Sequence, residues 1–163
     1  VNFTGSTLAI TRAPLSITAE SKAKALGATD PAFTVTYAGF VNGETASALG
    51  GTLTFTRAPG ESVGSYSITP SGLTGANYAI SFNPGTLTIF GLPVLSPPAF
   101  VGNTVVLTWT AFSNASYRVQ FKPALSAAGW TDVVGDVLAT GSTASKSDIL
   151  TGSNRFYRVQ VLP

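Results

Sequence analysis

The sequence contains no cysteine, no histidine and no methionine among its 163 residues. Without cysteine there are no disulfide bonds, no thiolate chemistry and no cysteine-based zinc site. Without histidine the commonest general base and metal ligand are missing, and a Ser-His-Asp triad is impossible. We therefore predict that the chain is not an enzyme and has no metal or other cofactor. The missing methionine predicts a fragment or a processed product.

Charged side chains are also scarce, at 10% of the sequence, against roughly 25% in an average soluble domain. The net charge is +2, and no run of lysine or arginine indicates a nucleic-acid partner. No apolar run is long enough to predict a membrane span, and no signal peptide is recognisable. A weakly charged surface rich in serine and threonine, without cysteine, is typical of secreted bacterial proteins. We expect an extracellular or cell-surface location.

Alternation of apolar and polar residues with a period of two dominates the chain. This pattern predicts strands that bury one face and leave the other in water. It occurs at residues 33–37, 52–56, 65–68, 78–82, 86–90, 105–109, 117–121 and 156–161. Turn-forming residues separate these strands, for example Asn42-Gly43 and Pro59-Gly60. The one helix-like stretch, 20–26, we interpret as a turn or an edge strand that Lys22 and Lys24 protect from aggregation.

A change of composition divides the chain near its middle. Residues 91–98, GLPVLSPP, contain three prolines and predict an extended connector. We predict an all-β protein of two tandem immunoglobulin-like β-sandwiches with an extra N-terminal strand. The expected boundaries are 1–11 for the strand, 12–90 for the first domain and 91–163 for the second.

The first ten residues resemble a later part of the chain, with Phe3, Thr7, Leu8 and Ile10 identical. VNFTGSTLAI aligns without a gap with ISFNPGTLTI at 80–89. Two interpretations remain open. Residues 1–11 are either the last strand of a preceding repeat, or a donor strand that completes the sheet of a neighbouring copy. In the second case the assembly residues are Val1, Phe3, Leu8 and Ile10.

Sequence motifs in the first domain are those of a known repeat. The spacings DP.F, GF.NGE, R.PGE.VG.Y.I and NY.I.F..G.L.I cover most of residues 15–89. This segment resembles the bacterial immunoglobulin-like MBG repeat of large secreted and surface proteins. One departure is Leu26-Gly27, where such repeats often have Tyr-Gly. The change loses an aromatic ring but keeps the glycine turn.

The second domain resembles a different module. LTW, YRVQF, GWTDV and RFYRVQVLP over residues 92–163 are similar to the C-terminal fibronectin type III-like domain of secreted bacterial proteins. In that pattern the chain usually stops after the final strand, so we expect Pro163 to be the native C-terminus. Neither family brings catalytic residues. The two resemblances imply spacer, stalk, adhesive or assembly roles.

Few residues stand out as candidate ligand contacts. Trp130 follows a glycine and is the aromatic residue best placed to contact a polysaccharide, although a core position is the simpler interpretation. Asp132 and Asp136 lie near it, as a hydrolytic pair or, more simply, as turn acids. YRVQ occurs at 117–120 and again at 157–160. Its arginines either form an anion site or face solvent on two similar strands.

Two functions remain open from the sequence. The first is a structural repeat of an extracellular bacterial stalk or fibre, whose partners are neighbouring copies or repeats and which polymerises through its N-terminal strand. The alternative is an accessory module that binds polysaccharide or a surface protein within a larger secreted protein. The sequence names neither the ligand nor what lies upstream.

Overall fold

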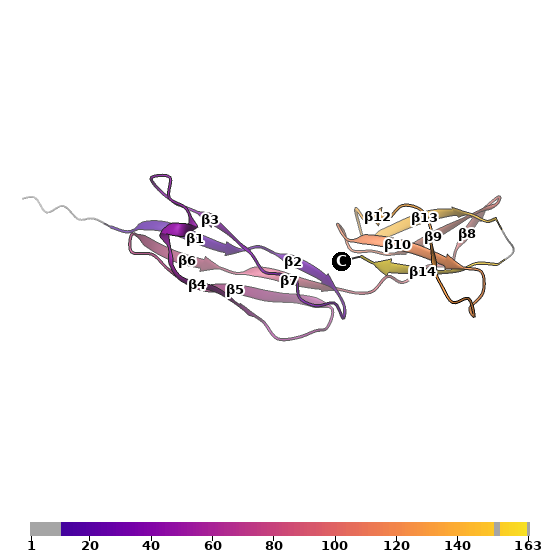
Figure 1. The fold of residues 1–163 in the computed structure, drawn as a ribbon, viewed down its shortest axis with the longest axis horizontal. Helices are drawn as coiled ribbons and strands as arrows, with labels where there is room; N and C mark the ends of the chain where they lie inside the picture. Colours follow the sequence, from indigo (N-terminus) through magenta and orange to yellow (C-terminus); the bar gives the residue numbers. More distant parts are fainter. Residues whose placement is uncertain (1–10, 152–153, 163) are drawn as a thin grey trace, which may run out of the picture. The chain divides into compact units, whose positions relative to one another are not determined.

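The computed structural model describes residues 11–151 and 154–162, and this part of the chain is all-β (Figure 1). Its one helical element is the single 3₁₀ turn η1 (Ala46–Ala48). The predicted all-β fold class is therefore confirmed. The chain divides into two compact units, of which unit 1 extends to Lys24 and continues over Thr29–Ile89, and unit 2 contains Ala25–Ala28 and the residues from Phe90 onward.

Unit 1 contains two sheets. In the first sheet, the central strand β1 pairs antiparallel with one neighbour and parallel with the other. The second sheet has the order β2-β7-β5-β4. The strands of the first sheet are β1 (Ala13–Ala19), β3 (Val35–Ala38) and β6 (Tyr78–Asn83). Those of the second sheet are β2 (Lys22–Ala25), β4 (Gly50–Arg57), β5 (Gly64–Thr74) and β7 (Gly85–Phe90).

The core of unit 1 lies between these sheets, because β5 contacts both β1 and β6. The period of two is visible in β7, where Leu87 and Ile89 are buried, and in β1, where Leu15 and Ile17 are buried. Tyr78 at the start of β6 is buried as well. Burying alternate side chains of both sheets supplies the apolar contact area that holds such a layered structure together.

Unit 2 also contains two sheets. The first has the order β13-β9-β8; the second has β10 at its centre with β14 on one edge and β11 and β12 on the other. The strands of the first sheet are β8 (Ala99–Val101), β9 (Thr104–Thr110) and β13 (Thr143–Ile149). Those of the second are β10 (Ser116–Lys122), β11 (Thr131–Asp132), β12 (Val137–Leu138) and β14 (Phe156–Val161).

A single apolar cluster fills unit 2. Trp109 and Tyr117 are its largest fully buried side chains, and their rings are 5.9 Å apart. The Tyr117 hydroxyl accepts a hydrogen bond from the backbone N–H of Phe112, which satisfies the buried phenol. Trp109 therefore occupies the core position that the alternation of 105–109 predicts.

The stretch 20–26 contains an edge strand, as predicted, but the proposed role of one lysine is wrong. β2 is an edge strand of the second sheet of unit 1. Lys22 is half-buried, whereas Lys24 is 7% exposed and points inward. The two lysines share one face of the strand, but Lys22 begins β2 and pairs with Glu20, whereas Lys24 lies deeper and pairs with Asp30 and Glu61.

Candidate functional site

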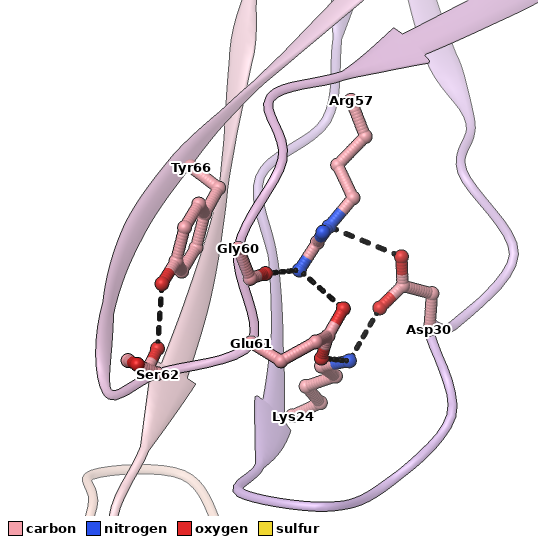
Figure 2. Close-up of polar contacts among 7 residues, drawn as sticks. All are labelled: Lys24, Asp30, Arg57, Gly60, Glu61, Ser62 and Tyr66. Carbon is pink, nitrogen blue, oxygen red and sulfur yellow. Dashed lines mark hydrogen bonds and ion pairs between the residues drawn. The ribbon is translucent and has the colours of Figure 1, made fainter.

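The most densely charged site in unit 1 is a four-residue ionic network formed by Lys24, Asp30, Arg57 and Glu61 (Figure 2). Lys24 comes from β2 and Arg57 ends β4, while the two acids lie in loops. The Lys24 ammonium donates hydrogen bonds of 2.6 Å to Asp30 Oδ1 and to Glu61 Oε2. Its side chain is 5% exposed, so both acids are needed to compensate the buried charge.

Arg57 joins the same two acids from the other side. Its Nη2 lies 3.0 Å from Glu61 Oε1, and its Nε lies 3.1 Å from Asp30 Oδ2 as an ion pair without hydrogen-bond geometry. Nη2 also donates to the Gly60 carbonyl oxygen at 2.6 Å. Each carboxylate therefore bridges two cations, and the network is neutral overall.

Tyr66, on β5, contacts the network through Arg57. The Arg57 guanidinium lies 4.9 Å from the centre of the Tyr66 ring, and the Tyr66 hydroxyl donates to the Ser62 carbonyl oxygen at 2.8 Å (Figure 2). Gly60 has φ +130°, and a Cβ there would lie 2.3 Å from a Tyr66 ring carbon. Glycine is therefore the residue that allows the 58–63 loop to pass this ring.

Each charged group in this network is paired with oppositely charged groups of the same network. The pKa of Lys24 is raised, first by its hydrogen bond to Asp30 and then by that to Glu61, so the amine stays protonated and is not a nucleophile. Among the residues that the structure describes, no group of His, Cys, Asp and Glu side chains is arranged to hold a metal ion. The arrangement fastens the loops after β2 and after β4 to the sheet, and we assign it a structural role.

A second ionic network lies on the outer face of β10 in unit 2. Arg118 Nε and Nη2 donate to the two carboxylate oxygens of Asp136, both at 2.8 Å, and Nη1 lies 3.3 Å from Asp132. The hydrogen bond from Arg118 lowers the pKa of Asp136. A carboxyl group with a lowered pKa is ionised at neutral pH and is a poor general acid. Arg118 binds both acids, Asp136 in a loop and Asp132 in β11, so the geometry favours a structural role over the hydrolytic pair.

The candidate ligand residue Trp130 lies next to this network, just before β11. Its ring is half-buried, and the charged groups of Arg158 and Lys122 lie 4.4 Å and 4.9 Å from the ring centre. Arg158 also donates to Gln120 Oε1 at 2.7 Å, and Gln120 donates to Asp132. Cations therefore already occupy positions over the ring that a stacked sugar would use.

The two YRVQ motifs are paired with each other. They form most of β10 and β14, which run antiparallel so that Val119 lies opposite Val159 and Gln120 opposite Arg158. Arg118 binds two acids, whereas Arg158 binds Gln120 and Trp130. The repeat is therefore two similar neighbouring strands, and the arginines do not share one anion.

The other candidate site residues cannot be placed. Val1, Phe3, Leu8 and Ile10, the assembly residues expected from the sequence, lie outside the described residues. The network of Lys24 was missed, although its acids and its arginine are the charged letters of the DP.F and R.PGE motifs. The sequence did offer a signal for this network: these loop motifs contain both acidic and basic residues.

Comparison with known proteins agrees with part of this description. The fold is that of an all-β protein with layered sheets. The family model of the MBG domain (YGX type) matches residues 15–88, which confirms the resemblance for that segment. Neither the curated proteins nor the solved structures gave a match to this chain. Among the described residues no helix is long and apolar enough to cross a membrane.

Proposed function

We propose that this chain is a structural repeat segment of a bacterial surface stalk or fibre, located outside the cell. The match of residues 15–88 to the MBG domain carries the proposal. The ionic networks support it, because their charges are bound to each other and hold loops in place. The low content of charged residues is in keeping with a secreted protein.

We further propose that copies join through the N-terminal strand. Residues 1–10 align with residues 80–89, with identity at Phe3, Thr7, Leu8 and Ile10, and residues 80–89 form most of β6 and nearly all of β7. A segment with the sequence of a sheet-completing strand is suited to pair with an unpaired strand edge of another copy. A head-to-tail contact of this kind that does not close into a ring produces a filament.

Residues 92–163 we assign to a fibronectin type III-like module. Two short-stranded sheets around one apolar core, with Trp109 on β9 and paired YRVQ strands, support this assignment. Such a module would lengthen a stalk and contribute no catalytic residues.

Electron microscopy of the purified chain tests the proposed function. We expect regular filaments from the full chain and none after deletion of residues 1–10. Circular dichroism shows whether the shortened chain keeps its β-structure. Filaments that survive the deletion contradict strand-mediated joining, and labelling confined to the interior of intact producing cells contradicts the stalk assignment.

The second candidate function is an accessory module that binds polysaccharide or a surface protein. One observation favours it: polar side chains of β10 and β14 surround the half-buried Trp130, although Lys122 and Arg158 already lie over its ring. If this is the function, a polysaccharide-containing gel retards the chain, and Trp130→Ala removes the retardation while Trp130→Phe keeps part of it. Equal mobility of all three proteins contradicts it.

A further inference from the structure

In unit 2, β14 has an unpaired edge. Among the residues that the structure describes, β14 pairs with β10 over six residues and with no strand on its other side (Figure 1). Its core-facing side chains Tyr157, Val159 and Val161 pack on the apolar cluster but are only half-buried. Their partners Tyr117 and Val119 on β10 are each 1% exposed. The core of unit 2 is therefore less covered at β14 than at β10.

The other sheet has an uncovered edge on the same side. β11 and β12 share the edge of β10 opposite β14, and β12 contacts β13. The strand farthest from β13 in its sheet is β8, so β8 and β14 lie on the same side of the two sheets.

Apolar side chains on this side face the core and yet remain exposed. Phe100 on β8 lies directly opposite Val105, which is buried, so the two side chains share the core-facing side of the sheet. Phe100 is nevertheless 65% exposed. Leu95 lies opposite the buried Trp109 and is 37% exposed. Both side chains lie on the side of the sandwich where β14 has its open edge.

The chain itself supplies a segment with the composition of such a strand. Residues 6–11, STLAIT, alternate Leu8 and Ile10 with Thr7, Ala9 and Thr11, carry no charge and equal β14 in length at six residues. Leu8 and Ile10 align with Leu87 and Ile89, the two apolar side chains that β7 buries in unit 1. The segment therefore has one apolar face for the core and one polar face for water.

We propose that residues 6–11 of one copy add to the open edge of β14 in unit 2 of a second copy, with Leu8 and Ile10 turned toward the core and the exposed Phe100. This rests on the proposed joining through the N-terminal strand and specifies its acceptor. Backbone hydrogen bonds to β14 give affinity, and the apolar face fixes the register. Each copy then offers a donor in front of unit 1 and an acceptor in unit 2, so the contact is head-to-tail.

Two variants with matched controls test the donor and the acceptor. Leu8→Asp/Ile10→Asp places charges on the apolar face, and its control Thr7→Asp/Ala9→Asp places the same charges on the polar face. Phe100→Asp places a charge on the core-facing side of β8, and its control Val101→Asp changes the neighbouring residue, which is 69% exposed on the other side. Phe100 and Val101 are both exposed, and circular dichroism verifies the folding of every variant.

Sedimentation velocity over a hundredfold range of concentration measures the association. We expect the unmodified chain and both controls to form a concentration-dependent series of oligomers, and each test variant to associate at least tenfold more weakly. A mixture of the two test variants should form a one-to-one dimer that grows no further, because one keeps only a donor and the other only an acceptor. Hydrogen exchange should show protection of the β14 amides in that dimer.

Other occupants of the edge give different results, and each overturns the proposal. A dimer that survives Leu8→Asp/Ile10→Asp means that two β14 edges pair with each other. Protection of β14 in a monomer means that the segment folds back on its own chain. Oligomers that Phe100→Asp leaves intact while Leu8→Asp/Ile10→Asp removes them mean that the strand joins copies elsewhere, so the proposed function holds and this acceptor is wrong.

Discussion

Lys24 and Lys22, two residues apart on β2, show how strongly the position of one charge matters. Lys22 is half-buried, binds Glu20 at 3.0 Å and lies near solvent. Lys24 is 5% exposed and binds two carboxylates. Pairs exposed to water contribute little to stability, whereas an ammonium withdrawn from water depends on its partners. The same residue type is thus an ordinary surface residue at position 22, whereas at position 24 it binds acids of two different loops.

Replacing Lys24 by methionine is expected to destabilise unit 1. The change leaves Asp30 and Glu61 facing each other with Arg57 as their remaining partner in the network, and the 58–63 loop loses one of its attachments. We expect the melting temperature from circular dichroism to fall by several degrees. Lys22→Met is the control and should change it by much less; equal effects of the two variants would contradict the structural role of the network.

Tyr157 makes the free energy of unfolding depend on pH in the alkaline range. Burial, and then the hydrogen bond to Asp148, raises the pKa of Tyr157 to about 12. Because the folded-state pKa lies above the ordinary value of 10.0, the stabilisation is complete below pH 10 and is lost as the pH rises toward 12. We expect the free energy of unfolding, from urea titrations, to fall over this interval.

The matched variant for this prediction is Tyr157→Phe. It should reduce the decrease between pH 10 and 12, because the group that releases its proton on unfolding is gone. Tyr37→Phe, whose ring packs on Phe40, is the control for the loss of a phenol. Part of the decrease should persist in Tyr157→Phe, because the hydrogen bond to Glu44 also raises the pKa of Tyr78. A pH profile unchanged by Tyr157→Phe contradicts the assignment.

At the scale of the element, a strand's place in the sheet decides how much its apolar residues contribute. β10 and β14 share the sequence YRVQ, yet Val119 on the central strand is 1% exposed and Val159 on the edge strand is half-buried. The same four-residue sequence is therefore packed to different extents, because β10 has neighbouring strands on both sides and β14 has a neighbouring strand on one side.

Valine-to-alanine changes measure this difference. Val119→Ala removes fully buried methyl groups and should cost about 2 kcal/mol, and Val159→Ala about 1 kcal/mol, in chemical denaturation of the monomer. The cost of Val159→Ala should increase when the chain associates, because an added strand completes the burial. Equal costs in the monomer would mean that the β14 edge is already covered.

Most strands with an apolar face were predicted from the sequence, but β1, which buries Leu15 and Ile17, was not among them. The alternation at 105–109 and 117–121 led directly to β9 and β10. β13, TASKSDI, was missed because its alternate residues are alanine, lysine and aspartate, so period two leaves no apolar signal. The ionic network was missed because Lys24 and Glu61 are 37 residues apart, and their meeting depends on how two loops fold.

At the scale of the whole molecule, the two units have separate cores. The buried clusters of unit 1 contain Leu15, Ile68 and Leu87, and that of unit 2 contains Trp109 and Val119. Each unit is of a size that folds as a domain, with modest stability.

We therefore predict two separable unfolding transitions. Both tryptophans, Trp109 and Trp130, lie in unit 2, so their fluorescence reports this unit alone, while circular dichroism reports both. Leu87→Ala should destabilise unit 1 by about 3 kcal/mol. It should shift one part of the circular dichroism curve and leave the tryptophan curve in place. A shift of both curves would show that the units unfold together.

The parallel pairing of β1 with β6 has a mechanical consequence for any chain under tension. Six residue pairs, from Ala13 opposite Tyr78 to Thr18 opposite Asn83, join the strand that enters unit 1 to the strand that continues through Pro84 into β7, its last strand. Pulling on the two ends of the unit drags these strands past each other lengthwise, so the hydrogen bonds share the load and rupture together. Peeling would instead break them one by one, at lower force.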